Sequence, residues 1–69
     1  MSISVNLAEV MARRQCRSKD LAEAIGITEA NLSILKSGKA KAIRFTTLKA
    51  ICKHLNCSPG DLLSYELED

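Results

Sequence analysis

Apolar residues recur at three- and four-residue spacing along most of the chain, which is typical of amphipathic helices. This pattern predicts a first helix over residues 7–15. A second helix is expected to begin at Ser18, a good N-cap, and to end at Gly26, because glycine readily adopts the left-handed conformation that ends helices. A third is expected to begin at Thr28, another cap-forming residue, and to end just before Gly38.

Two further helices are predicted in the second half. One covers residues 45–55, and both Thr46 and Arg44 are candidates for its N-cap. The other opens in the segment SPGD, with Ser58 as N-cap, proline at the first helical position and an aspartate three residues after the cap. The two ends of the chain alternate apolar and polar residues, so we expect them to pair as a small antiparallel ribbon beside the helices.

Composition limits the classes of protein that fit this pattern. The chain has 69 residues, enough for one domain, and is 46% hydrophobic and 26% charged, an ordinary globular balance. It offers neither an apolar run long enough for a membrane span nor a secretory leader. Its three cysteines, Cys16, Cys52 and Cys57, form no CxxC pair, which favours free thiols, with Cys52 as a small core residue. We therefore expect a cytoplasmic protein without a metal or a cofactor.

The net charge of +2 conceals an uneven distribution of charge. Between residues 30 and 60 the sequence has six cations and no acid, whereas residues 61–69 contain four acids and no cation. A basic stretch of this kind favours a polyanionic partner, although many such runs are only solvated surface.

The second and third predicted helices are separated by only the dipeptide GI, which forces their axes to cross steeply. Helix-turn-helix units have a short turn of this type that contains glycine. Ala22 is small where the helices approach each other, and Gly26 can take the positive φ that a tight turn requires. The residues from 18 to 37 therefore form a candidate helix-turn-helix unit.

The segments SKDLAEAIGITEANLSILKSGK and FTTLKAICKHLNCSPGDLL resemble the Cro-type (Xre-like, lambda-repressor-like) helix-turn-helix family of bacterial and phage regulators. The resemblance extends over residues 7–63 and is strongest with compact members that end soon after a CxPGDLLxY segment. It implies an all-α bundle of five short helices that acts as a homodimer on double-stranded operator DNA, commonly as a repressor. It also implies that residues 28–36 form the recognition helix.

The outer face of this third helix is short and polar, as a helix in the major groove requires. Threonine and serine there can donate or accept hydrogen bonds, alanine can contact a thymine methyl group, and glutamate can accept from a cytosine amino group. Asparagine can read adenine or can instead bond locally at the helix start. The candidate base-contacting residues are Thr28, Glu29, Ala30, Asn31 and Ser33. Many relatives carry Gln or Arg at the places of Glu29 and Ala30, so we expect modest base readout or readout of DNA shape.

Phosphate contacts are expected on both sides of the recognition helix. The start of the second helix supplies free backbone N–H groups and nearby cations, and the segment after the third helix is rich in lysine and arginine. The candidate phosphate-contacting residues are Arg17, Ser18, Lys19, Ser37, Lys39, Lys41 and Arg44.

Apolar residues near the C-terminus indicate a candidate dimer surface, although the sequence does not choose between core and interface for them. They are Leu62, Leu63, Tyr65 and Leu67. A lone histidine, His54, without a triad-like arrangement gives no reason to expect an enzyme. The main alternative is a protein-interaction module with the same fold, antirepressor-like or antitoxin-like, that binds a partner protein and has weak or no specific binding to DNA.

Overall fold

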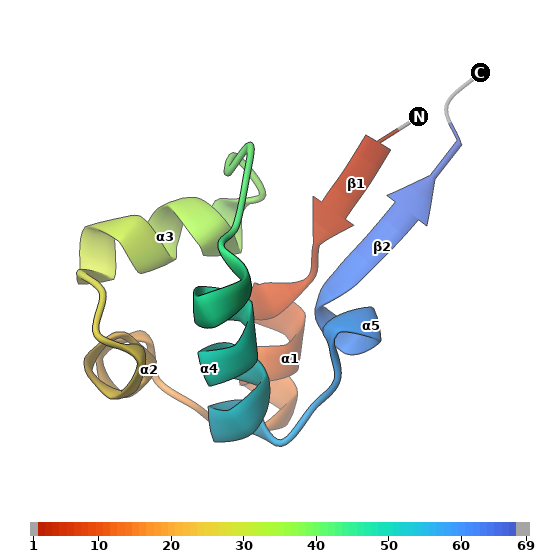
Figure 1. Cartoon of the computed structure of the whole chain (residues 1–69). Helices are drawn as coiled ribbons and strands as arrows, with labels where there is room; N and C mark the ends of the chain where they lie inside the picture. Colours follow the sequence, from red (N-terminus) through yellow and green to blue (C-terminus); the bar gives the residue numbers. More distant parts are fainter. Residues whose placement is uncertain (1, 68–69) are drawn as a thin grey trace.

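The computed structural model describes residues 2–67 as five helices and a two-stranded sheet. The elements follow in the order β1 (Ser2–Val5), α1 (Leu7–Arg13), α2 (Ser18–Ile25), α3 (Glu29–Ser37), α4 (Phe45–Leu55), α5 (Pro59–Leu62) and β2 (Leu63–Glu66). Figure 1 shows α2 and α3 at one end of the molecule and the ribbon of β1 and β2 at the other. The predicted bundle of five short helices with a small terminal ribbon is confirmed.

The helices enclose a core of aliphatic side chains. Leu7 of α1, Leu21 of α2, Leu32 of α3 and Ile51 of α4 are each at most 1% exposed. Within residues 2–67, the buried side chains are all apolar. Each enclosed leucine or isoleucine contributes about 1.5–3 kcal/mol to folding, so these four residues provide much of the stability of so small a core. In this described range, every helix falls short of the length and apolar character that a bilayer crossing demands.

The structure separates the four residues of the candidate dimer surface. Leu62 is 2% exposed and belongs to the core, because it lies in α5 and packs against the helices. Leu63 is half-buried, whereas Tyr65 is 60% and Leu67 76% exposed. Leu62 therefore cannot contribute to a surface on the folded chain, and the other three can.

Several predicted helix ends are confirmed. The hydroxyl oxygen of Thr28 accepts a 3.0 Å hydrogen bond from the backbone N–H of Asn31, which caps α3. At α5, the carboxylate of Asp61 accepts from the backbone N–H of Ser58 at 2.9 Å and from its hydroxyl at 3.1 Å, completing a capping box. Of the two candidates at the start of α4, Arg44 is the N-cap, without a side-chain cap bond.

Two predicted helix ends are wrong. Ser18 is the first residue of α2 rather than its N-cap, which is Arg17, and the Ser18 hydroxyl oxygen accepts a bond from Lys36 instead. Helix α1 ends at Arg13 rather than Gln15, because Gln15 has a φ of 54° and the chain turns there. The backbone N–H of Cys16 then closes the turn by donating to Met11 at 2.9 Å.

The terminal ribbon is antiparallel and pairs Ile3 with Tyr65 and Val5 with Leu63. Side chains alternate between the two faces of a strand, so these four residues share one face. The backbone N–H of Asn6 donates to the carbonyl of Leu62 at 2.6 Å, which attaches the ribbon to the bundle. A two-stranded ribbon is marginal alone, and here the helices support it.

The thiols of Cys16, Cys52 and Cys57 are free and half-buried. Cys52, expected in the core, packs against the core but is only partly enclosed. Burial raises the pKa of the Cys16 and Cys57 thiols, so both are protonated at neutral pH. A nucleophilic cysteine requires a lowered pKa, and these two thiols have the opposite shift.

Candidate nucleic-acid interface

A tight turn joins α2 to α3. Gly26 takes the left-handed conformation, with φ 77° and ψ 32°, as the predicted turn requires. The backbone N–H groups of Gly26 and Ile27 both donate to the carbonyl of Ala22, at 2.9 and 3.0 Å. Ala22 is 3% exposed, so a larger side chain there would push the two helices apart. Figure 1 shows the result, with α2 viewed end-on and α3 lying lengthwise beside it.

Helical periodicity divides the exposed surface of α3 into rows. Leu32 and Leu35 are buried, and the residues directly opposite them are Ala30 and Ser33, both exposed. Glu29 is also exposed, and helical periodicity places it on the same side of α3 as Lys36, two turns away. The predicted base-contacting residues Glu29, Ala30 and Ser33 therefore lie on the outer surface of α3.

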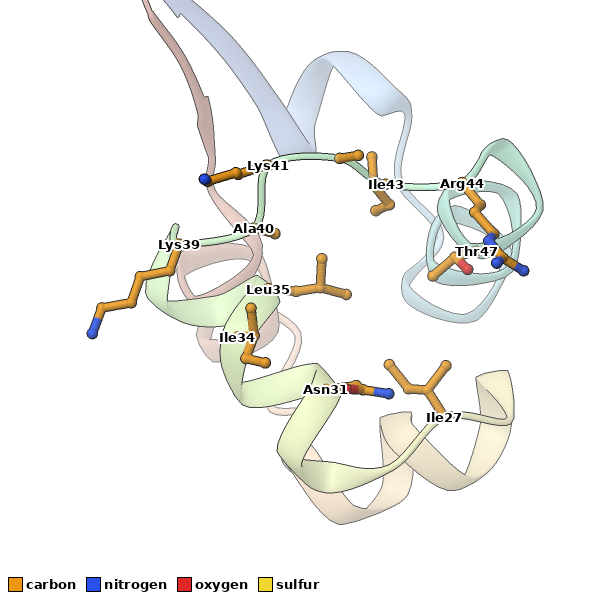
Figure 2. Close-up of a pocket in the computed structure, with 11 residues that line it drawn as sticks. Ile27, Asn31, Ile34, Leu35, Lys39, Ala40, Lys41, Ile43, Arg44 and Thr47 are labelled. Atoms are coloured by element: carbon orange, nitrogen blue, oxygen red, sulfur yellow. The ribbon is translucent and has the colours of Figure 1, made fainter.

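Two of the predicted base contacts have additional roles. Thr28 is exposed, and its hydroxyl oxygen already accepts the capping bond from the N–H of Asn31, which leaves its hydroxyl proton free to donate. For Asn31, the local bond is made by its backbone and not by its side-chain amide. Figure 2 shows that amide extending toward Ile27, on a different side of α3 from Glu29 by helical periodicity.

An open hollow of about 660 Å³ lies between α3, the segment that follows it and the start of α4. Figure 2 shows Asn31 and Ile34 on its α3 side, and Arg44 and Thr47 at the start of α4. The charged residues that line it are Lys39, Lys41 and Arg44. We call this the cationic hollow, because the positive field around it can attract an anion such as a DNA phosphate.

The predicted phosphate-contacting residues thus form two groups. Lys39, Lys41 and Arg44 share this hollow beside α3. Arg17, Ser18 and Lys19 lie instead at the start of α2, where Arg17 and Lys19 are exposed and Ser18 is half-buried.

Two of the predicted phosphate-contacting residues, Ser37 and Ser18, are engaged within the protein. The hydroxyl of Ser37 donates to the carbonyl of Ile34 at 2.8 Å and accepts from the backbone N–H of Lys39 at 3.3 Å. Ser37 therefore shapes the start of the segment that bears Lys39. Ser18 accepts from the ammonium group of Lys36 at 2.7 Å, which leaves its own hydroxyl proton available to a phosphate oxygen.

Sequence reasoning missed Thr47, which lines the hollow. Thr47 lies in the first turn of α4, three residues after the N-cap Arg44, and both residues line the hollow. Ile34 is 48% exposed and lines the same hollow. The spacing from Arg44 was the available signal for Thr47, but the course of the preceding segment could not be read from the sequence.

Other charged groups lie away from the hollow. Arg13 forms an exposed ion pair of 3.4 Å with Glu9, and Arg14 donates to the carbonyl of Asn56 at 3.1 Å. Arg14 therefore satisfies a backbone acceptor at the end of α4. Among the described residues, no three His, Cys, Asp or Glu side chains gather in a way that could hold a metal ion.

Comparisons with known proteins give matches that extend over most of this chain. The Cro/C1-type HTH DNA-binding domain family matches residues 6–68. A protein of Bacillus subtilis (strain 168), described as the uncharacterized HTH-type transcriptional regulator YozG, is 54% identical over 69 residues, which is 100% of this chain and 82% of that protein. The crystal structure of the transcriptional regulator VanUg is similar with a TM-score of 0.73 and 28% sequence identity, over 96% of this chain and 87% of that chain.

Proposed function

Since the chain belongs to the family of Cro/C1-type HTH DNA-binding domains, we propose that it represses transcription by placing α3 in the major groove of double-stranded DNA. The observation that carries this proposal is the position of the cationic hollow directly beside the outer face of α3. Short side chains on that face let the helix approach the bases closely, while the hollow holds the neighbouring phosphate.

Base recognition would come from the exposed residues of α3. Ser33 can donate or accept, Ala30 can contact a thymine methyl group, and Glu29 can accept from a cytosine amino group. The hydroxyl proton of Thr28 remains available because its oxygen is the acceptor in the cap. Asn31 would contact the sugar–phosphate strand rather than a base, since its amide lines the hollow.

Phosphate binding would use both groups of cations. The strand on one side of the groove would contact Lys39, Lys41 and Arg44 at the rim of the hollow, where Figure 2 shows the two lysine side chains extending outward. The strand on the other side would contact Arg17, Lys19 and the first N–H groups of α2. Each neutralised phosphate adds about 0.9 to the slope of log affinity against log salt, so affinity would fall steeply as salt rises.

A homodimer would extend this contact to two half-sites. One short helix reaches few bases, and two copies related by a two-fold axis would read half-sites about 34 Å apart on one face of the duplex. Selection of bound sites from a random DNA pool would then yield an inverted repeat. Selection of unrelated single sites, or of none, would contradict dimeric operator binding.

The direct test of the DNA-binding surface is charge reversal with a matched control. Lys39→Glu and Lys41→Glu alter the hollow, whereas Lys53→Glu makes the same change of charge on an exposed position of α4 outside it. Binding of a random duplex is measured by fluorescence anisotropy over a range of salt concentrations. Each hollow variant should lower the salt slope by about 0.9, and Lys53→Glu should leave it unchanged.

Two results would refute the proposal. One is a wild-type protein that fails to bind duplex DNA at low salt, which would favour a module that binds a partner protein instead. The other is an equal loss of affinity in all three variants, which would mean that net charge alone, and not the hollow, determines binding.

A further inference from the structure

A second hollow lies on α4 away from Arg44 and Thr47, and its lining is almost wholly apolar. It has a volume of about 570 Å³, and the residues around it are Phe45, Leu48, Lys49, Cys52, Pro59 and Leu63. Phe45 stands at its edge with 85% of its surface exposed. An aromatic ring in this position is costly in water, because it leaves a large apolar area solvated.

This apolar surface continues onto the ribbon. Leu63 lines the hollow beside Phe45 and also a smaller neighbouring hollow with Ile3 and Val5, where Lys41 is the charged residue. The strand register places Tyr65 opposite Ile3 and on the same ribbon face as Leu63. We call this continuous surface, formed by Phe45, Leu48, Cys52, Pro59, Leu63, Ile3 and Tyr65, the Phe45 face.

The exposed apolar area is large for so small a protein. Ile3 is 71% exposed and Tyr65 60%, in addition to Phe45. Since an enclosed aromatic side chain buries roughly 150–250 Å², the exposed parts of Phe45 and Tyr65 come to on the order of 300 Å², and Ile3 adds to this area. Together these areas are about half of the roughly 800 Å² that each partner buries in a standard interface, and the half-buried residues between them can supply much of the rest.

We propose that a second copy of this chain binds to the Phe45 face, with the Phe45 ring of each copy entering the hollow of the other. This inference rests on the homodimer proposed above. A projecting ring beside an apolar hollow is self-complementary, which is the property that a two-fold interface requires. Among the described residues that line this hollow, only Lys49 is charged, and its flexible stem can keep the ammonium group at the solvated edge.

The position of the Phe45 face is compatible with DNA binding. Phe45 and Lys49 line the apolar hollow, whereas Arg44 and Thr47 on the same helix line the cationic one. Pairing through the Phe45 face therefore leaves the outer row of α3 uncovered in both copies. The two surfaces adjoin at residues 40–43, which line both the cationic hollow and the smaller hollow beside Ile3.

The first test is sedimentation equilibrium of the free protein at micromolar concentrations. The wild type should show twice the 7.5 kDa chain mass. Phe45→Ser should weaken self-association by at least about thirtyfold, the loss expected for an interface hot spot. The matched control is Ile34→Ser, which removes another exposed apolar side chain, 48% exposed, from the cationic hollow. It should remain dimeric.

A second measurement needs no variant. The Cys52 thiol lines the apolar hollow, so dimerisation should protect it from alkylation as protein concentration rises. Cys16, which lies outside the Phe45 face, serves as the internal reference, with labelling read by mass spectrometry. Slower labelling of Cys52 relative to Cys16 at higher concentration supports the proposal, and a constant ratio contradicts it.

Failure of this proposal can be told apart from failure of the DNA-binding one. The Phe45 face is not a self-interface if the wild type stays monomeric at every concentration, in which case the surface would serve a different protein. The same conclusion follows if the Phe45→Ser variant is as dimeric as the wild type. Neither result alters the salt-dependent duplex binding attributed to Lys39 and Lys41. A dimer sensitive to Phe45 that binds no duplex would instead support this interface and refute the DNA-binding proposal.

Discussion

The ammonium group of Lys36 donates a 2.7 Å hydrogen bond to the hydroxyl oxygen of Ser18, joining the last turn of α3 to the first turn of α2. Both side chains are half-buried. The bond adds a polar contact to the turn at Gly26, so the crossing of the two helices is held at the turn and at the far end of α3. Helix α2 has no side-chain cap because its N-cap is Arg17, whose guanidinium group donates hydrogen bonds and cannot accept one.

Removing either partner should lower stability, and the two losses should be coupled. Ser18→Ala and Lys36→Met are each expected to reduce the free energy of unfolding by about 1 kcal/mol, a typical value for a partly buried hydrogen bond. The double variant should lose less than the sum of the two, which urea denaturation of all four proteins will show. Additive losses would mean that the bond contributes nothing in solution.

Gln15 provides a site where stability can be gained. With a φ of 54°, it holds the left-handed conformation that ends α1, which costs a residue with a Cβ atom roughly 1–2 kcal/mol. Gln15→Gly should raise the free energy of unfolding by up to about 1 kcal/mol, because part of the relief is offset by glycine's greater freedom in the unfolded chain. The control Gln15→Ala keeps the strain and should not stabilise. An equal gain from both would point to the glutamine side chain rather than its backbone.

The reverse change at Gly26 should be destabilising. Its φ of 77° disfavours any side chain, yet a Cβ atom built there meets nothing within 4 Å. Gly26→Ala should therefore lose about 1 kcal/mol from backbone strain alone. Gly26→Asn should lose less, because asparagine tolerates the left-handed region. Thermal unfolding distinguishes these cases, and an alanine loss no larger than the asparagine loss would contradict the assignment of strain.

Much of the fold could be predicted because it depends on neighbours in the sequence. The bounds Phe45–Leu55 of α4 match the predicted range, since its buried stripe repeats every three or four residues. The capping box at Ser58 and the terminal ribbon were likewise visible as local patterns. Features that depend on contacts between residues distant in sequence were not visible. Ser18 was assigned the wrong role, because its hydrogen-bond partner, Lys36, lies 18 residues away.

The candidate interface likewise has one part that could be predicted from the sequence and one part that could not. The exposed row of Ala30 and Ser33 follows from helical periodicity, so the sequence was sufficient to predict it. The hollow depends on the irregular segment between α3 and α4, whose course has no periodic signal, and this is why Thr47 was missed. The 85% exposure of Phe45 was also beyond the sequence, because an aromatic residue at the start of a helix can face the core or the solvent equally well.

Acid should weaken the start of α5. Hydrogen bonds from the backbone N–H and the hydroxyl of Ser58 lower the pKa of Asp61 below its usual value of 3.8. A lowered pKa in the folded state means that the capping box stabilises the protein above the unfolded-state pKa, and that this contribution is lost as pH falls through the folded-state value. Asp61→Asn should therefore lower the Tm at pH 7, and the difference from the wild type should shrink as the pH falls below 3.8 and through the lowered folded-state pKa.

The control for Asp61 is Glu23→Gln, which removes an exposed acid from α2. It should not reproduce the Tm difference at pH 7. A difference between Asp61→Asn and the wild type that stays constant across the acid range would show that the cap acts through shape alone and not through the charge of Asp61.

Glu29 should act against DNA affinity and in favour of base discrimination. Its carboxylate is exposed at the start of α3, close to where the proposed pose brings the phosphates. Glu29→Gln should therefore raise affinity for random duplex by about three- to fivefold at low salt, since one unit of like-charge repulsion is removed. If Glu29 accepts from a cytosine amino group, the same variant should lose preference at one position of a selected site.

The charge-matched control is Glu66→Gln in β2, at the opposite end of the molecule from α3. Anisotropy titrations of both variants decide the matter, because an equal gain from Glu66→Gln would attribute the effect to net charge and remove Glu29 from the proposed interface.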